Sequence, residues 1–163
     1  MSFKAEVKTN VGWDWNAGAV DNGRLEYARQ FLCGNGSGQA EAVWHTENQT
    51  LASGNATVLD LQSLTRMILG VELTISFQTV KNLLIVNRST SGGTLLVGGA
   101  ENNQWWAPFG RSGDKVAVPP DSPLLLGNRM EGWPVDAAGH CLQLAAVGGD
   151  VTYSIAVVGT ITA

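Results

Sequence analysis

Charged side chains are scarce in this chain, and no run of like charges occurs. Asp, Glu, Lys and Arg make up 15% of its 163 residues, against about 25% in an average soluble domain. The 10 basic and 14 acidic residues give a net charge of −4 and form no basic cluster, which argues against direct binding to DNA or RNA. Because 44% of the residues are hydrophobic, we expect one folded domain whose surface is partly covered by other subunits or by a partner.

Long apolar runs and cysteines are also few. No segment approaches the roughly 20 apolar residues that span a bilayer, and the N-terminus has no apolar stretch of signal-peptide length. We therefore expect synthesis in a cytoplasm and no membrane partner. Cys33 and Cys141 are too few for a disulfide framework. Both stand among apolar neighbours, which predicts two buried thiols.

No catalytic pattern stands out either. The chain has no phosphate loop, nucleophile elbow, zinc spacing or calcium loop. His140 and Cys141 are adjacent on an expected strand, so their side chains point to opposite faces and cannot share one ion. A pair formed in space by Cys33 and His140, and a role for His45, stay open as minor hypotheses. The sequence thus predicts no enzyme, no catalytic residue, no cofactor and no metal site, with a hydrolase as the third choice of function.

What the chain does have is a series of short apolar runs separated by turns. Alternating or apolar runs that predict strands cover 42–44, 57–61, 73–77, 80–87, 94–98, 116–118, 124–126, 140–145 and 151–160. Glycine pairs supply the tight turns between them. Residues 63–70 are expected to form one short helical turn. The pattern predicts an all-β, jelly-roll-like antiparallel β-sandwich over residues 41–163.

Residues 1–40 differ from the rest and are treated as an N-terminal strand, loop and hinge. Phe3, Ala5 and Val7 alternate with charged residues and predict an amphipathic edge strand. A second apolar run covers 25–33, and the glycine-rich segment 34–38 predicts a flexible hinge. Two interpretations stay open: the strand closes the edge of its own sandwich, or it reaches across to a neighbouring subunit.

Six tryptophans are the most informative side chains. Trp44 is expected in the core. The other aromatic side chains stand in or beside polar loops, where exposed rings commonly mark a binding surface. This candidate interaction surface consists of Trp13, Trp15, Trp105, Trp106, Phe109 and Trp133. The alternative interpretation is that these rings cap the open ends of a small sandwich.

From Val71 to Thr160 the chain resembles small virion structural proteins of tailed bacteriophages. The resemblance is carried by the runs 73–77 and 80–87, the segments 95–100, 119–126 and 132–136, and the ending 151–160. It is a pattern of strand order and turn type, and it brings no functional residue with it. It implies a capsid decoration or cement protein on the outer surface of the virion. Its implied partners are the major capsid protein and copies of itself, with a trimer favoured over a dimer.

A second function class is a carbohydrate-binding or lectin-like module, in the head fibre or the tail. In that hypothesis the aromatic rings stack on sugars, and nearby polar side chains orient the hydroxyls. The residues concerned are Trp105, Trp106 and Trp133 for stacking, with Asn102, Asn103 and Asp136 for hydrogen bonding. Glycans are therefore included among the expected partners, because a sandwich serves either function.

Overall fold

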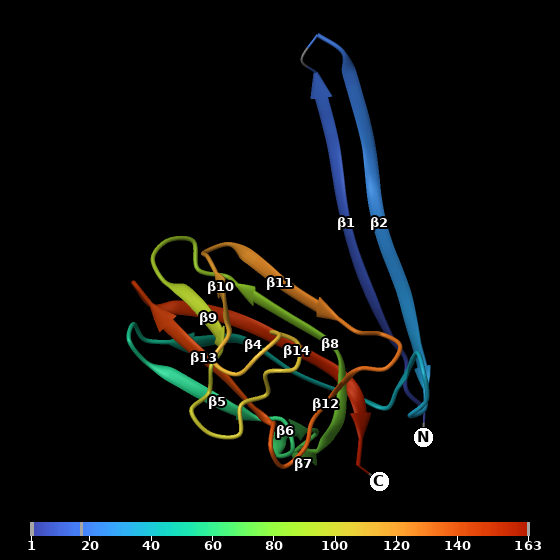
Figure 1. The fold of residues 1–163 in the computed structure, drawn as a ribbon, viewed down its shortest axis with the longest axis vertical. Coiled ribbons are helices and arrows are strands. Elements are labelled where there is room, and N and C mark those ends of the chain that lie inside the picture. Colours follow the sequence, from blue (N-terminus) through green and yellow to red (C-terminus); the bar gives the residue numbers. More distant parts are fainter. Residues whose placement is uncertain (1, 17, 163) are drawn as a thin grey trace.

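The computed structural model describes residues 2–16 and 18–162, and these residues form strands and no helix. Two antiparallel sheets pack face to face as a β-sandwich (Figure 1). This confirms the predicted fold class. One sheet has the order β11(Ser122–Gly127), β8(Phe77–Asn87), β14(Val151–Ile161) and β4(Ala42–Leu51). The short strand β12(Trp133–Pro134) pairs with the first part of β8. The other sheet has the order β10(Lys115–Val118), β9(Thr94–Gly98), β13(Cys141–Val147) and β5(Ala56–Asp60).

The strand pairing is that of a jelly roll. The first sandwich strand along the chain, β4, pairs with the last, β14, and the second, β5, pairs with the second-last, β13. The same nesting continues inward, with β8 on β11 and β9 on β10. A ribbon of nested antiparallel pairs that is split between two sheets is the double Greek-key arrangement of jelly rolls. The strand 80–87 is central, as predicted, since β8 lies between β11 and β14.

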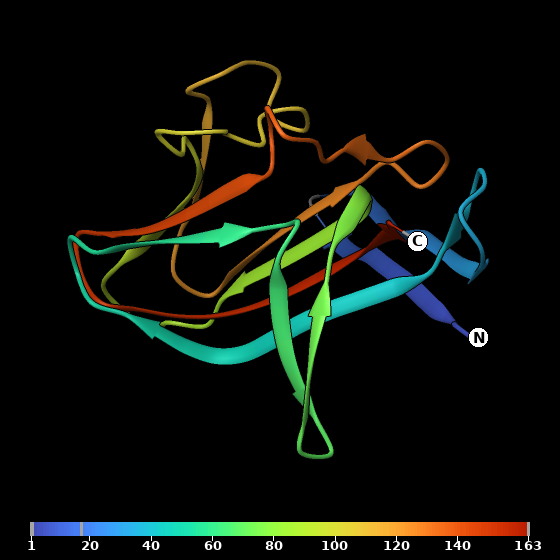
Figure 2. The same ribbon diagram turned by 90° about the horizontal axis from the view of Figure 1, so that it is seen from below.

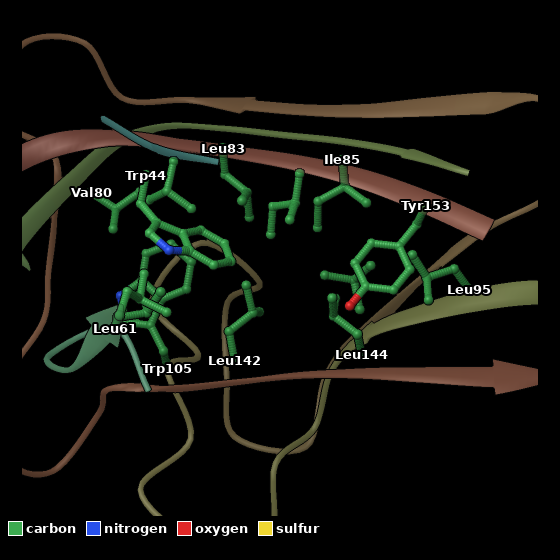
Figure 3. Packing of buried hydrophobic residues seen from close by; sticks show 14 of the residues in the cluster. Trp44, Leu61, Val80, Leu83, Ile85, Leu95, Trp105, Leu142, Leu144 and Tyr153 are labelled. Atoms are coloured by element: carbon green, nitrogen blue, oxygen red, sulfur yellow. The ribbon is translucent and has the colours of Figure 1, made fainter. Parts of the chain in front are cut away.

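The core lies between the two sheets and is closed by aromatic side chains (Figure 3). Along β13, Leu142 and Leu144 point inward at every second position, as expected for a strand with one buried face. Trp44, predicted as core, is 7% exposed and donates from Nε1 to the Thr65 carbonyl oxygen at 2.8 Å. Tyr153 fills the other end of the core, where burial raises the pKa of its hydroxyl.

A short hairpin, β6(Leu64–Ile68) and β7(Val71–Ile75), protrudes from the sandwich (Figure 2). The predicted helical turn over 63–70 is wrong, because these residues form β6 and the hairpin turn. The predicted strand 73–77 is divided, since the chain leaves β7 and enters β8 at Phe77, whose N–H donates to the Leu61 carbonyl at 2.9 Å. Side chains at the tip are apolar and exposed, and Leu69 is fully exposed.

The most prominent element is a long arm made of β1(Ala5–Asn16) and β2(Val20–Cys33), which projects away from the sandwich (Figure 1). At roughly 3.4 Å per residue, strands of this length reach about 40 Å. The base of the arm joins the body through the two-residue strand β3(Gln39–Ala40), which pairs parallel with the end of β2. The segment predicted as a flexible hinge is a turn with backbone hydrogen bonds from Gly34 to Ala40 and from Gln39 to Gly36.

The cysteines do not occupy the core. Cys33 is exposed at the end of β2, and Cys141 is half-buried at the start of β13. The prediction of two buried thiols is therefore wrong. The apolar neighbours of Cys33 in the sequence suggested that it is buried. However, β2 belongs to a two-stranded arm, in which adjacent residues alternate between two open faces.

Candidate interaction surface

The arm has one apolar and one polar face. Residues directly opposite each other in an antiparallel pair share a face, and the register pairs Val11 with Leu25, Thr9 with Tyr27 and Trp15 with Asp21. The opposite face carries the intervening polar residues. We call the apolar set the arm ridge; it consists of Ala5, Val7, Val11, Trp13, Trp15, Leu25, Tyr27 and Phe31.

The outer part of the arm ridge lies open to solvent. Every described residue from 8 to 27 is exposed. The large apolar side chains have exposed fractions of 63% for Val11, 63% for Trp15 and 72% for Leu25. Contiguous apolar surface of this kind usually marks a contact with another molecule. The predicted surface residues Trp13 and Trp15 therefore lie on a single face, as the spacing of two residues suggested.

Trp13 is held in a fixed orientation on this ridge. Its indole Nε1 donates to Asp21 Oδ2 at 3.2 Å. The ring covers Gly23, where a Cβ atom would lie 2.6 Å from the indole. Glycine is thus required for this packing, an aromatic ring shielding a cross-strand glycine. A ring already fixed before binding loses less conformational entropy on contact.

A small second core fixes the base of the arm. Phe31, 1% exposed, packs with Ala40 and with Val158 on the outer face of β14. The predicted edge-strand residues Phe3, Ala5 and Val7 pack around this cluster. They therefore anchor the arm and do not extend either sandwich sheet, although β1 is a free edge of the arm.

Two basic side chains strengthen the joint between the base of the arm and the sandwich. Lys81, 2% exposed, donates from Nζ to the carbonyl oxygens of Gly36 at 2.7 Å and Met130 at 3.0 Å. Burial lowers the pKa of the Lys81 ammonium, a shift that nearby Glu131 opposes. Arg129 donates to the Gln30 carbonyl oxygen at 3.0 Å and lies over the Phe31 ring. Arg129 thus ties the end of β2 to the body, and Lys81 ties the loop that follows the arm.

An apolar hollow lies on the outer face of the same sheet, next to the joint. Its volume is about 320 Å³, and its floor is formed by Leu84, Val86 and Ala156. These side chains point away from the core because their neighbours Leu83 and Ile85 point into it. Charged and polar groups on the rim are His45, Glu47, Arg88 and Ser154.

The remaining aromatic residues of the predicted surface are mostly internal. Trp105 is 1% exposed and donates from Nε1 to the Pro134 carbonyl oxygen at 2.9 Å. Phe109 and Trp133 contact the Trp105 ring edge-on, with centroids 6.3 and 6.2 Å away. The placement of Trp105 on a surface is therefore wrong, and it closes the end of the core. Of this group Trp106 alone is a large exposed side chain, at 45%.

Of the three polar side chains predicted around these rings, Asp136 is engaged in its own turn. Asp136 accepts from the backbone N–H groups of Ala138 and Gly139, both at 2.9 Å. Asn102 and Asn103 are exposed in the loop before the tryptophans. A three-ring platform for sugars is absent from this loop cluster, because Trp105 is internal and Trp133 packs against it.

The two histidines have separate local contacts, and the thiol of Cys141 is poorly suited to act as a nucleophile. His140 Nδ1 lies 3.0 Å from the Asp136 carbonyl oxygen, and His45 lies 3.9 Å from a Glu47 carboxylate oxygen. Burial, and then the carboxylate of Asp60, raise the pKa of the Cys141 thiol, which disfavours the nucleophilic thiolate. Within residues 2–16 and 18–162, no group of three His, Cys, Asp or Glu side chains could hold a metal ion.

Comparisons with known proteins add no relative: no family model, no curated protein and no solved structure matches this chain. Across the described part of the chain, no helix has the length and apolar character that crossing a membrane requires.

Several residues of this surface escaped the sequence analysis. Leu25, Tyr27 and Phe31 recur at even spacing in β2, and that alternation was the available signal for an amphipathic second strand. The hollow residues Leu84 and Val86 lie in a run that is apolar on both faces, so nothing in the sequence separates their outward side chains from the core.

Proposed function

We propose that this protein is a non-enzymatic virion structural protein that decorates or cements the outer surface of a tailed-phage capsid as a homo-oligomer. The observation that carries the proposal is the arm ridge, an apolar surface on an element that projects from a complete jelly roll (Figure 1). The resemblance over residues 71–160 supplies the class of assembly. Jelly rolls occur in both viral capsid proteins and lectins, so the surface rather than the fold supports this choice.

The arm suits attachment to a repeated lattice. Apolar burial stabilises a contact by about 25 cal/mol per Å², and the ridge offers large side chains that water now surrounds. A contact of modest strength becomes durable when many copies bind one shell, because linked sites add avidity. The major capsid protein and further copies of this chain are the proposed partners.

The experiment is a binding titration with expanded, empty capsids of a phage whose genome encodes this chain. We expect saturable attachment, measured by co-sedimentation, with a fixed number of copies per shell. The matched variants are Trp15→Asp on the arm ridge and Val20→Asp on the polar face of the same arm, where Val20 is 69% exposed. Attachment should fall for the first variant and persist for the second. Absence of saturable attachment by the unaltered protein would refute the proposal.

Carbohydrate binding remains the second proposed function, and the exposed ring of Trp106 favours it. Trp106 lines a shallow hollow with Gln104 and Asp136. A glycan array that shows binding, together with its loss in Trp106→Ala, would support this alternative. Absence of glycan binding would remove it.

A further inference from the structure

The outer face of the sheet β11-β8-β14-β4 is arranged in cross-strand rows. The first row joins Asn82, Val158 and Val43, and the base of the arm covers it, so that Asn82 and Val158 are 6% and 7% exposed. The second row joins Leu125, Leu84 and Ala156. The arm ridge therefore already packs on the first row of this face within one chain.

The cover stops after the first row. Leu84 and Ala156 in the second row and Val86 in the third are only half-buried, and they line the apolar hollow. A β-sandwich gains from covering such a face, since each apolar side chain removed from water stabilises the packed state. The open rows continue directly from the row that the arm occupies.

The arm cannot cover these rows in its own chain. Phe31, Lys81 and Arg129 fix its base, and from there the arm leads away from the body (Figure 1). Its outer half, with Val11, Trp13 and Leu25, lies open to water. One molecule thus carries two partly covered apolar surfaces. The arm ridge is covered at its base and open in its outer half, and the sheet face is covered in its first row and open at the hollow.

We infer that the outer half of the arm ridge docks on the Leu84, Val86 and Ala156 hollow of a second copy of this chain. The inference deepens the proposed function and rests on its oligomer: the outer ridge joins the copies, the oligomer attaches to the capsid, and Trp15→Asp lowers capsid attachment because it breaks the oligomer. The contact extends the packing seen at the arm base, where the same ridge covers the same sheet face. In a two-fold pair each copy gives one ridge and receives another, so the contact closes on itself.

The area is sufficient for a stable pair. Since aromatic side chains carry about 150–250 Å² each, the exposed Trp13, Trp15, Tyr27, Leu25 and Val11 leave on the order of 500 Å² to bury. The two ridges of a two-fold pair together offer roughly the 1,000 Å² that a specific interface needs, and the hollow of about 320 Å³ receives part of each ridge.

The charges near the contact permit this arrangement. The ridge face carries two charged residues, Asp21 opposite Trp15 and Arg29 opposite Val7, and Arg29 lies over the Tyr27 ring. The hollow carries Arg88 and Glu47 on its rim, one charge of each sign. Apolar contact therefore decides the affinity, with Arg88 available as a partner for Asp21.

The test compares solution masses by light scattering. The unaltered protein should have at least twice the 17.2 kDa of one chain. Leu25→Asp on the ridge and Leu84→Asp in the hollow should each weaken association at least 100-fold and give monomers. The matched controls are Val20→Asp on the polar arm face and Val58→Asp on the other sheet, which are 69% and 52% exposed. A monomeric unaltered protein, or equal losses in controls and test variants, would overturn the inference.

A cross-link identifies the occupant of the hollow. In chains with Cys33→Ser and Cys141→Ser, one copy carries Trp15→Cys and the other carries Val86→Cys. Mixing followed by oxidation should give a disulfide-linked pair, and replacing Trp15→Cys by Val20→Cys should abolish it. An oligomer that links arm to arm only would overturn the assignment. An oligomer that cross-links as expected but does not attach to capsids would keep the inference and refute the capsid function.

Discussion

At the scale of single residues, the most unusual group is the buried amine of Lys81. Its Nζ donates to two carbonyl oxygens, one in the loop after the arm and one beside Arg129. Removing an ammonium from water is costly, and two carbonyl acceptors compensate only part of that loss. The lowered pKa of Lys81 shows that the folded state favours the neutral amine more than the unfolded chain does.

A pH dependence follows from this shift. The unfolded chain has the ordinary lysine pKa of 10.5 and the folded state a lower one, so between these values the unfolded state binds more protons. The free energy of unfolding therefore rises with pH across that window and falls as pH drops through the folded value. In Lys81→Met this contribution is lost. Urea unfolding from pH 7 to 10.5 should show the difference between unaltered protein and variant growing by at most about 1.4 kcal/mol per pH unit. Parallel curves would contradict the prediction.

At the scale of elements, the β6–β7 hairpin ends in a turn that folding alone does not favour. The turn of the β6–β7 hairpin places Leu69 and Gly70 at φ values of 51° and 81°. Two-residue turns with two positive φ angles prefer Asn-Gly, because Asn tolerates the left-handed region and leucine does not. Leu69 is also fully exposed. Its left-handed backbone is therefore strained, and its apolar side chain lies in water.

Leu69→Asn should therefore stabilise the protein by about 1 kcal/mol. The reason is relief of the left-handed backbone, and no buried contact is lost because the side chain lies in solvent. The measurement is the urea midpoint at constant slope. Leu69→Ala is the control, since alanine keeps the backbone strain and removes only exposed carbons. An equal gain in both variants would show that the backbone is not the cause.

The elements also show how far a sequence of this kind can be interpreted. The sandwich strands were predictable because one buried face imposes alternation, as in β13, and because glycine turns separate the runs. The β6–β7 hairpin was not, since Leu64 to Gly70 has apolar residues at both strand-like and helix-like spacings. In the arm, Trp13 and Trp15 were correctly predicted to share one face. The hollow at Leu84 was not predictable, because β8 is apolar on both faces and sequence periodicity cannot tell which of its faces the fold leaves outside the core.

At the scale of the whole molecule, two separate clusters hold the chain together. The main core draws its buried residues from Trp44 to Val157 and includes none from the arm. The second cluster, with Phe31, Ala40 and Val158 as its buried members, attaches the arm to the outside of one sheet. The jelly roll pairs its first strand with its last without help from β1 or β2. The sandwich therefore contains all the contacts that its own folding requires.

Residues 34–163 should consequently fold without the arm. Loss of the Phe31 packing should lower the free energy of unfolding by about 3–5 kcal/mol, as for removal of a buried phenylalanine side chain. Near-ultraviolet circular dichroism reports the packing of Trp44 and Trp105, and it should keep its native shape, with a single urea transition at lower concentration. A lost aromatic signal would mean that the arm is part of the folding unit. A retained signal with a lower urea midpoint would mean that the arm adds stability through Phe31 at its base, while the sandwich reaches its native packing without the arm.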